Sequence, residues 1–146
     1  YDNIYLIANY GVLPFWLLLI ILPTHGLTNF LVQSIFVPFI LASTYCFVAY
    51  NIFIDENILD SFELYLGLDG LYSMFSNEAF LLTFWIHFLA LSLFLGAWIV
   101  RDSNKYMVPR FITIISLIIT YFTGPVGLFV YWFFRIFFSK KISFND

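Results

Sequence analysis

One histidine lies inside a long apolar stretch of the chain and is the first candidate for chemistry. His87 falls within residues 79–100, where nearly every other side chain is apolar. On a helix it would lie roughly 12 Å from the start of that stretch, at about 1.5 Å per residue. An ionisable group at that depth in an apolar helix is costly, so it is a candidate functional residue. The imidazole could contact a substrate, exchange a proton, bind a haem or chlorophyll metal, or simply hydrogen-bond to a neighbouring helix.

Residues around His87 and in the last apolar stretch predict a site for a flat apolar ligand. Ala90 and Phe94 share the helix face of His87, and a small residue such as Ala90 lets a ligand approach closely. Two tryptophans could line the same pocket, and the Gly-Pro pair of the last stretch predicts a widened cavity there. The predicted substrate- or pigment-binding residues are Trp85, Ala90, Phe94, Gly124, Pro125 and Trp132.

Other kinds of catalytic or metal site are not predicted. His25 is the other imidazole and lies in a turn sequence, so a bis-histidine haem is disfavoured, and the chain lacks the ligands of a metal cage. Cys46 is the one cysteine and is interpreted as a small buried apolar residue. The run Gly124-Pro125-Val126-Gly127 lacks the lysine and preceding strand of a phosphate loop. We therefore expect no fixed cofactor, and the predicted cavity would instead admit a long apolar molecule.

The elements that must position His87 are membrane helices, because the composition excludes a soluble domain. Hydrophobic residues make up 62% of the chain and charged residues 10%, against about 25% charged in soluble domains. The net charge of −3 offers no basic surface for nucleic acid. The sequence therefore predicts an all-α integral membrane protein with membrane lipids as its first partners.

Four apolar stretches predict four transmembrane helices in a single transmembrane domain covering residues 1–146. They lie at about residues 5–22, 30–54, 79–100 and 109–138. About 20 apolar residues cross a hydrocarbon core roughly 30 Å thick, so the first stretch is just long enough and the last is too long for one straight helix. Pro14 predicts a kink in the first stretch. Gly124-Pro125 predicts that the last stretch is divided into two half-helices.

The segment between the second and third stretches is acidic. Residues 55–78 hold six of the nine acidic side chains and no Lys or Arg. The spacing of apolar residues at 59, 62 and 66 predicts a short amphipathic helix at the membrane interface, interrupted at Leu66–Gly70. The alternative is a solvated acidic loop.

Four crossings would place Arg135, Lys140 and Lys141 on the same side as the acidic segment and both termini. Arg101, Lys105 and Arg110 would then lie together in one short loop on the opposite side. We expect that compact basic loop to face the cytoplasm or the stroma.

Several of these segments also resemble a known family. The run from Trp85 to Ile99, followed by Asp102, closely resembles the signature of the neoxanthin-synthase-like, abscisic-acid-deficient type of membrane protein. Pro14-Phe15-Trp16-Leu17-Leu18, Pro23, Pro38-Phe39 and Gly124-Pro125-Val126-Gly127-Leu128 fall in the order expected for that family. The resemblance covers nearly the whole chain and includes bacterial and algal relatives of unknown function.

The resemblance implies a carotenoid isomerase that opens a xanthophyll epoxide, as in the conversion of violaxanthin to neoxanthin. Such a reaction needs a proton donor at the epoxide oxygen and a base at a polyene carbon, and His87 matches a family position that could serve as either. The family usually has an acid where Ser92 stands and often an arginine where Ala97 stands. These departures favour isoprenoid binding over that specific reaction.

Two interpretations of function therefore stay open. The first is an isomerase in a bacterial inner membrane or a plastid membrane, with His87 as the catalytic residue. The second is a non-catalytic subunit that binds a carotenoid, chlorophyll or lipid within a larger photosynthetic or respiratory complex. The scarcity of polar groups and the many aromatic side chains, 23% of the chain, agree with both.

Overall fold

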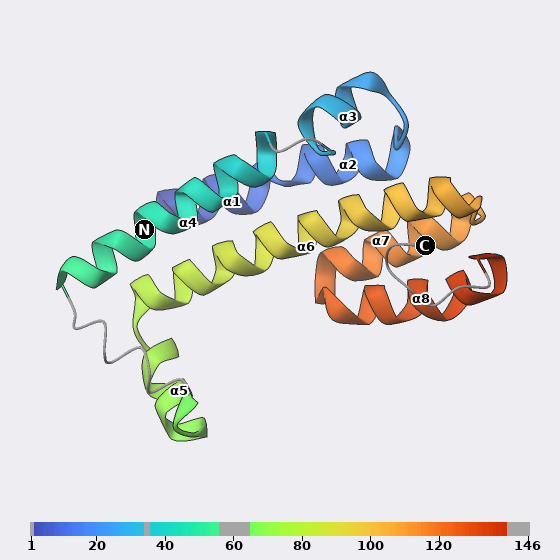
Figure 1. Ribbon diagram of the computed structural model, residues 1–146. Coiled ribbons are helices and arrows are strands. Elements are labelled where there is room, and N and C mark those ends of the chain that lie inside the picture. The colour runs from blue at the N-terminus through green and yellow to red at the C-terminus, as the bar shows by residue number, and fades with distance from the viewer. Residues whose placement is uncertain (1, 34–35, 56–64, 140–146) are drawn as a thin grey trace.

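The protein is a bundle of α-helices arranged around one long helix. The computed structural model describes residues 2–33, 36–55 and 65–139, and within these ranges all regular secondary structure is helical. The helices are α1 (Asp2–Gly11), α2 (Leu13–Ile21), α3 (Gly26–Leu31), α4 (Phe36–Asp55), α5 (Leu68–Phe75), α6 (Glu78–Tyr106), α7 (Arg110–Thr123) and α8 (Pro125–Ser139). Figure 1 shows α1, α2 and α4 along one side of α6 and the α7–α8 pair along the other.

Helix α6 is the axis of the fold because its 29 residues extend over about 43 Å at 1.5 Å per residue. Its start is fixed by Asn77, whose side-chain oxygen accepts a hydrogen bond from the Phe80 amide, as a helix N-cap does. Its end is fixed by Met107, which adopts the left-handed conformation at φ 55°. His87 lies on this helix, so α6 positions the predicted site.

The first apolar stretch, where Pro14 predicted a kink, is interrupted at Val12. Helices α1 and α2 are separated only by Val12, and Pro14 lies in the first turn of α2, where its missing N–H costs no helical hydrogen bond. The second stretch begins later than predicted, since α3 ends at Leu31 and α4 begins at Phe36. The side chain of Thr28 ties this connection to α2 by donating to the Leu22 carbonyl at 2.6 Å.

The last apolar stretch turns back on itself instead of crossing once. Its division at Gly124-Pro125 is confirmed, but Gly124 has φ 66° and the chain reverses there, so α7 and α8 form an antiparallel hairpin (Figure 1). An added Cβ at Gly127 would collide with Thr120, which shows how closely the two helices approach. Helices of 14 and 15 residues are about 21 and 22 Å long, each shorter than a hydrocarbon core of roughly 30 Å.

This hairpin changes the distribution of charge that the sequence predicted. Helix α8 runs back toward the end of α6, so Arg135 lies beside Asp102 and not on the side of the acidic segment. Arg101, Lys105, Arg110 and Arg135, the basic residues in the part of the chain that the structure describes, therefore lie at one end of the bundle. The end of α4, helix α5 and the start of α6 lie at the other end (Figure 1).

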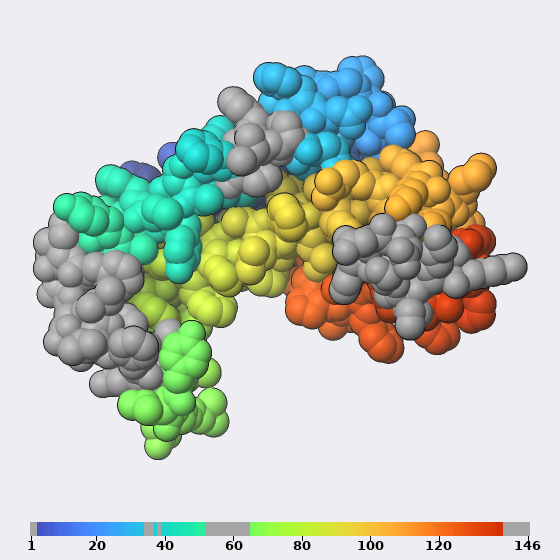
Figure 2. Space-filling model, in the orientation of Figure 1, coloured from blue at the N-terminus to red at the C-terminus, as the bar shows by residue number. Residues whose placement is uncertain are grey.

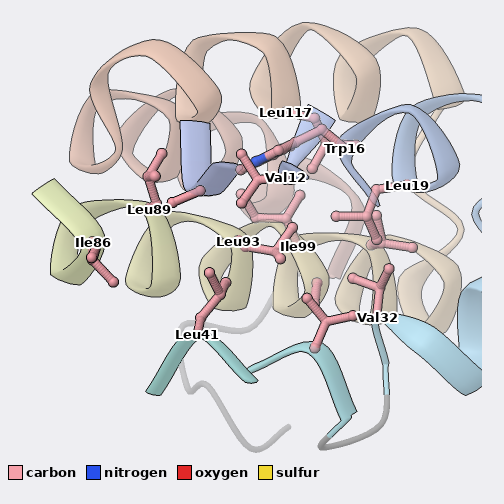
Figure 3. Packing of buried hydrophobic residues seen from close by; sticks show 14 of the residues in the cluster. Val12, Trp16, Leu19, Val32, Leu41, Ile86, Leu89, Leu93, Ile99 and Leu117 are labelled. Atoms are coloured by element: carbon pink, nitrogen blue, oxygen red, sulfur yellow. The ribbon is translucent and has the colours of Figure 1, made fainter. Parts of the chain in front are cut away.

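The core lies between α6 and the helices on both of its sides. Figure 3 shows Trp16 and Leu19 of α2, Leu93 and Ile99 of α6 and Leu117 of α7 packed together. Gly96 lets the ring of Trp16 on α2 pack directly on α6, because an added Cβ would lie 2.7 Å from that ring. Burial of these apolar side chains fixes the position of α2 and α7 against α6.

In the part of the chain that the structure describes, two helical stretches are long and apolar enough to cross a membrane: Asn3–Ile21, which runs through α1 and α2, and Glu78–Tyr106. The predicted four crossings are therefore not confirmed. Three shorter apolar helices accompany them among the described residues, at Phe39–Asn51, Arg110–Thr123 and Pro125–Phe138. Most of the predicted interfacial helix, residues 56–64, lies outside the described residues. The predicted interruption at Leu66–Gly70 is shorter in the structure, since α5 already begins at Leu68 after Gly67.

Candidate functional site

His87 lies on a partly exposed face of α6 that we call the outer strip. This strip consists of Phe80, Phe84, His87, Leu91 and Phe94, which recur every three or four residues and so share one face of the helix. Phe84, Leu91 and Phe94 are 46%, 54% and 57% exposed, and His87 is exposed as well. The imidazole is therefore accessible from the apolar surroundings of the helix.

Aromatic rings hold the imidazole in place. The ring of Tyr45 on α4 lies 5.9 Å from that of His87, and the ring of Phe84 lies 5.6 Å away, both tilted. Tyr45 is half-buried at the edge of the core, so its ring is positioned by the packing of α4 on α6. A phenol and an imidazole on adjacent helices can both donate or accept a hydrogen bond from a polar group that approaches the strip.

The molecule is hollowed beside the first half of α6. Figure 2 shows this hollow between α5 and the tip of the α7–α8 hairpin. Helix α5 contacts α6 through Phe75, whose ring lies 4.7 Å from that of Phe84. The hairpin tip reaches α6 near Phe88, where an added Cβ at Gly124 would lie 3.6 Å from the Phe88 ring. The stretch from Phe84 to Phe88 thus lies between two flanking elements.

The structure brings only some of the predicted site residues together. Phe94 is exposed on the outer strip, and Ala90 is half-buried beside it. Trp85 stacks on Phe88 with ring centroids 5.2 Å apart, and its indole N–H donates to Asn9 at 3.2 Å. Phe88 in turn lies next to buried Gly124, while Pro125 is exposed.

Trp132 lies away from His87, near the other end of α6. It stacks on Trp98 with ring centroids 5.9 Å apart, and it covers one face of the Arg135 guanidinium at 4.3 Å. The structure therefore does not bring Trp132 to His87, because the hairpin places Trp132 against the last turns of α6 and not at its middle.

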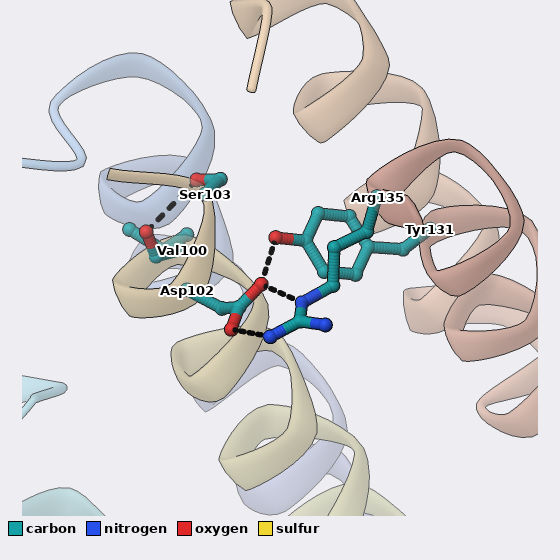
Figure 4. Close-up of polar contacts among 5 residues, drawn as sticks. All are labelled: Val100, Asp102, Ser103, Tyr131 and Arg135. Atoms are coloured by element: carbon teal, nitrogen blue, oxygen red, sulfur yellow. Dashed lines mark hydrogen bonds and ion pairs between the residues drawn. The ribbon is translucent and has the colours of Figure 1, made fainter. Parts of the chain in front are cut away.

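A buried polar cluster joins α6 to α8, and the sequence analysis did not predict it. Figure 4 shows the Asp102 carboxylate facing both Arg135 and Tyr131. Asp102 Oδ2 accepts from Arg135 Nε and from the Tyr131 hydroxyl, each at 2.6 Å, and Oδ1 accepts from Arg135 Nη2 at 3.1 Å. Arg135 and Tyr131 are 0% exposed and Asp102 is 6% exposed. The pair is bidentate and charge-assisted, which is the strong form of such a contact.

The side chains of this cluster are buried, so they stabilise the packing of α8 against α6 and are not accessible to a ligand. The guanidinium lies between the rings of Trp132 and Tyr106, at 4.3 and 4.7 Å from its central carbon. Such cation–π contacts add to the ion pair when the charge is desolvated. An arginine near a helix end extends to the membrane interface by default, but Arg135 is held in this buried cluster instead. The signal that could have identified the pair was an acid and an arginine within apolar helices, where each needs a partner.

Helix α7 packs through small polar side chains. Thr113, Ser116 and Thr120 share its buried face, and Thr120 donates to the Ser116 carbonyl within its own helix at 2.7 Å. The buried Ser116 hydroxyl has no hydrogen-bond partner among the described residues. Small residues allow close helix contact without an apolar driving force. This face explains the close contact between α7 and α8.

An apolar cavity of about 460 Å³ lies between α1, α2 and α4. Its one hydroxyl, that of Thr44, donates to the Ile40 carbonyl of its own helix at 2.9 Å. Such a space fits an alkyl or isoprenoid chain but offers no group for chemistry. Among the described residues there is also no group of three side chains suited to hold a metal ion.

Comparison with known proteins identifies the family. The sequence profile of the ABA DEFICIENT 4-like family matches residues 3–131. The chain belongs to this family. The match includes the outer strip, Asp102 and Tyr131, and it ends before Arg135.

A curated relative of the family is Protein ABA DEFICIENT 4, chloroplastic, from Arabidopsis thaliana. The two chains are 27% identical over 105 residues, which cover 70% of this chain and 48% of the relative. The chain thus spans about half the length of that relative. No solved structure matches this chain.

Proposed function

We propose that the protein is an integral membrane protein that binds an oxygenated carotenoid along the outer strip of α6. The observation that carries this proposal is the exposure of His87 on that strip, between Tyr45 and Phe84. The strip from Phe80 to Phe94 is about 21 Å long, and it offers a polyene an aromatic surface with a hydrogen-bonding group on it. Membership of the ABA DEFICIENT 4-like family supports a xanthophyll as the ligand class.

In this proposal three segments cross the membrane and the hairpin enters it from one side. Helices α1–α2, α4 and α6 are the crossing segments. The α7–α8 pair is re-entrant, since each of its helices is shorter than the hydrocarbon core is thick. Its tip at Gly124 meets α6 near Ser92, which is the middle residue of that helix. Backbone that turns at this depth is tolerated where it is packed against protein.

The charge distribution supports one orientation. The end of the bundle that carries Arg101, Lys105 and Arg110 faces the cytoplasm of a bacterium or the stroma of a plastid, because basic residues are retained on that side. Asp69 on α5 and Glu78 at the start of α6 then lie toward the opposite face of the membrane.

The proposed reaction is the isomerisation of a xanthophyll epoxide. One group protonates the epoxide oxygen as its carbon–oxygen bond breaks, and a base removes a proton from a neighbouring polyene carbon, so the atoms of the substrate are conserved. His87 would supply one of these proton transfers. If the pigment binds without conversion, the protein is instead a pigment-binding subunit.

The test is to express the full chain in a carotenoid-producing host and to purify it in mild detergent. We expect an absorption spectrum with polyene bands and an extract enriched in oxygenated carotenoids. Phe94→Ala on the outer strip should lower pigment retention several-fold. Phe129→Ala, a matched loss of an exposed aromatic side chain on α8, should not. A colourless preparation, or equal losses in both variants, would contradict binding on the strip.

His87 is tested separately for catalysis. Protein supplied with a xanthophyll epoxide is compared with His87→Ala by chromatography of the products. Loss of the isomer in the variant, with pigment still bound, supports proton transfer by His87. Undiminished product removes His87 from that role.

A further inference from the structure

A second cavity lies at the basic end of the bundle, between the α2–α3 turn and the α6–α7 turn. It measures about 470 Å³, and hydrogen-bond donors from both turns line it, including Thr24, His25, Asn104 and Arg110. We propose that this cavity binds the phosphate group of a lipid headgroup or of a small soluble phosphate. The site lies apart from His87 and does not depend on the carotenoid proposal.

Arg110, the first residue of α7, is held at the cavity by hydrogen bonds to the C-terminal end of α2. Its Nη2 donates to the Ile21 carbonyl at 2.7 Å and to the Ile20 carbonyl at 3.5 Å, at the C-terminal end of α2. Within the described part of the chain its Nε and Nη1 have no hydrogen-bond acceptor, and the residue lines the cavity. The guanidinium is therefore held by one nitrogen while others remain available to an anion. Arginine binds phosphate oxygens well because its donors form a planar fork.

His25 supplies a second, independently fixed donor. Its Nδ1 accepts a hydrogen bond from the Leu27 amide at 3.0 Å and so caps the start of α3. Because Nδ1 is the acceptor, the proton of the neutral ring is on Nε2, which is a donor. The exposed amide of Asn104 and the hydroxyl of Thr24 add two further donors at the cavity wall.

The charge of the surroundings favours an anion. None of the described residues that line the cavity is acidic. The nearest acid along α6, Asp102, is buried and its charge is compensated by Arg135. Arg101 and Lys105 lie on the same last turns of α6. Basic pockets between helices on the cytoplasmic side of a membrane are suited to anionic headgroups.

The experiment uses the full-length protein in mild detergent and two probes. Native mass spectrometry reports retention of phosphatidylglycerol against zwitterionic phosphatidylcholine, and calorimetric titration reports binding of inorganic phosphate. Preferential retention of phosphatidylglycerol identifies a lipid headgroup as the source. Binding of inorganic phosphate that displaces the lipid identifies a free phosphate. Equal retention of both lipids, with no heat from phosphate, overturns the proposal.

Three variants test whether binding depends on this cavity or only on the positive charge at this end of the bundle. Arg110→Gln should weaken binding about tenfold or more, while Arg101→Gln, an equal loss of charge outside the cavity, should change it less than about twofold. His25→Asp should abolish binding, because aspartate can still cap α3 but places a negative charge at the cavity. This variant remains informative if Arg110→Gln fails to fold. Equal effects of Arg110→Gln and Arg101→Gln, or undiminished binding by His25→Asp, would show that no built site exists.

Discussion

Replacing Asp102 with alanine removes the carboxylate that both Arg135 and Tyr131 contact. The variant leaves a guanidinium that is 0% exposed without the oxygens to which its Nε and Nη2 donate. Loss of one partner from a buried ion pair costs about 3–5 kcal/mol, because the remaining charge is desolvated and uncompensated. We therefore expect the free energy of unfolding to fall by about that amount in Asp102→Ala.

Two further substitutions divide this loss into its parts. Tyr131→Phe removes one hydrogen bond to a charged group and should cost about 1.5–3 kcal/mol. The double variant Asp102→Leu with Arg135→Met replaces both charges by apolar side chains and should be much less destabilised than Asp102→Ala, since no buried charge remains. This order distinguishes a charge effect from a simple loss of packing.

The assay is unfolding in mixed micelles of increasing denaturing-detergent fraction, followed by far-ultraviolet circular dichroism. Tryptophan fluorescence provides a local signal, because Trp98 and Trp132 stack beside the cluster. Ser103→Ala is the matched control, since Ser103 is also buried on α6 but bonds only to the Val100 carbonyl of its own helix. If Asp102→Ala is no less stable than Ser103→Ala, the cluster does not hold α8 against α6.

Two other predictions follow from the packing and the topology. Gly96→Ala places a methyl group 2.7 Å from the Trp16 ring and should lower the free energy of unfolding by about 1–3 kcal/mol in the same assay, whereas Gly26→Ala, with nothing within 4 Å, should be nearly neutral. In a cysteine-free background, Asn104→Cys and Ser139→Cys should react with a membrane-impermeant maleimide from the same side of the membrane, because α8 returns to the end where α6 finishes. Labelling from opposite sides would show that the last stretch crosses the membrane once and would contradict the re-entrant hairpin.

The sequence by itself determined the features that depend on local chemistry. The apolar composition predicted a helical protein, Pro14 predicted a kink close to the interruption between α1 and α2, and Gly124-Pro125 predicted the break between α7 and α8. His87 was identified because an imidazole within an apolar helix is rare, whatever the helix packs against. The signature around it was sufficient to suggest the family, which the family profile confirms.

Only the tertiary structure decided what the chain does after Gly124 and which charges meet. A Gly-Pro break is compatible with a kinked crossing or with a reversal, and the choice depends on how closely α7 and α8 can pack at Gly127 and Thr120. The reversal brings Arg135 to Asp102, 33 residues away in sequence, and moves Trp132 away from His87. Sequence spacing cannot give this result, because the pairing energy of two buried charges exists only once the helices that carry them lie side by side.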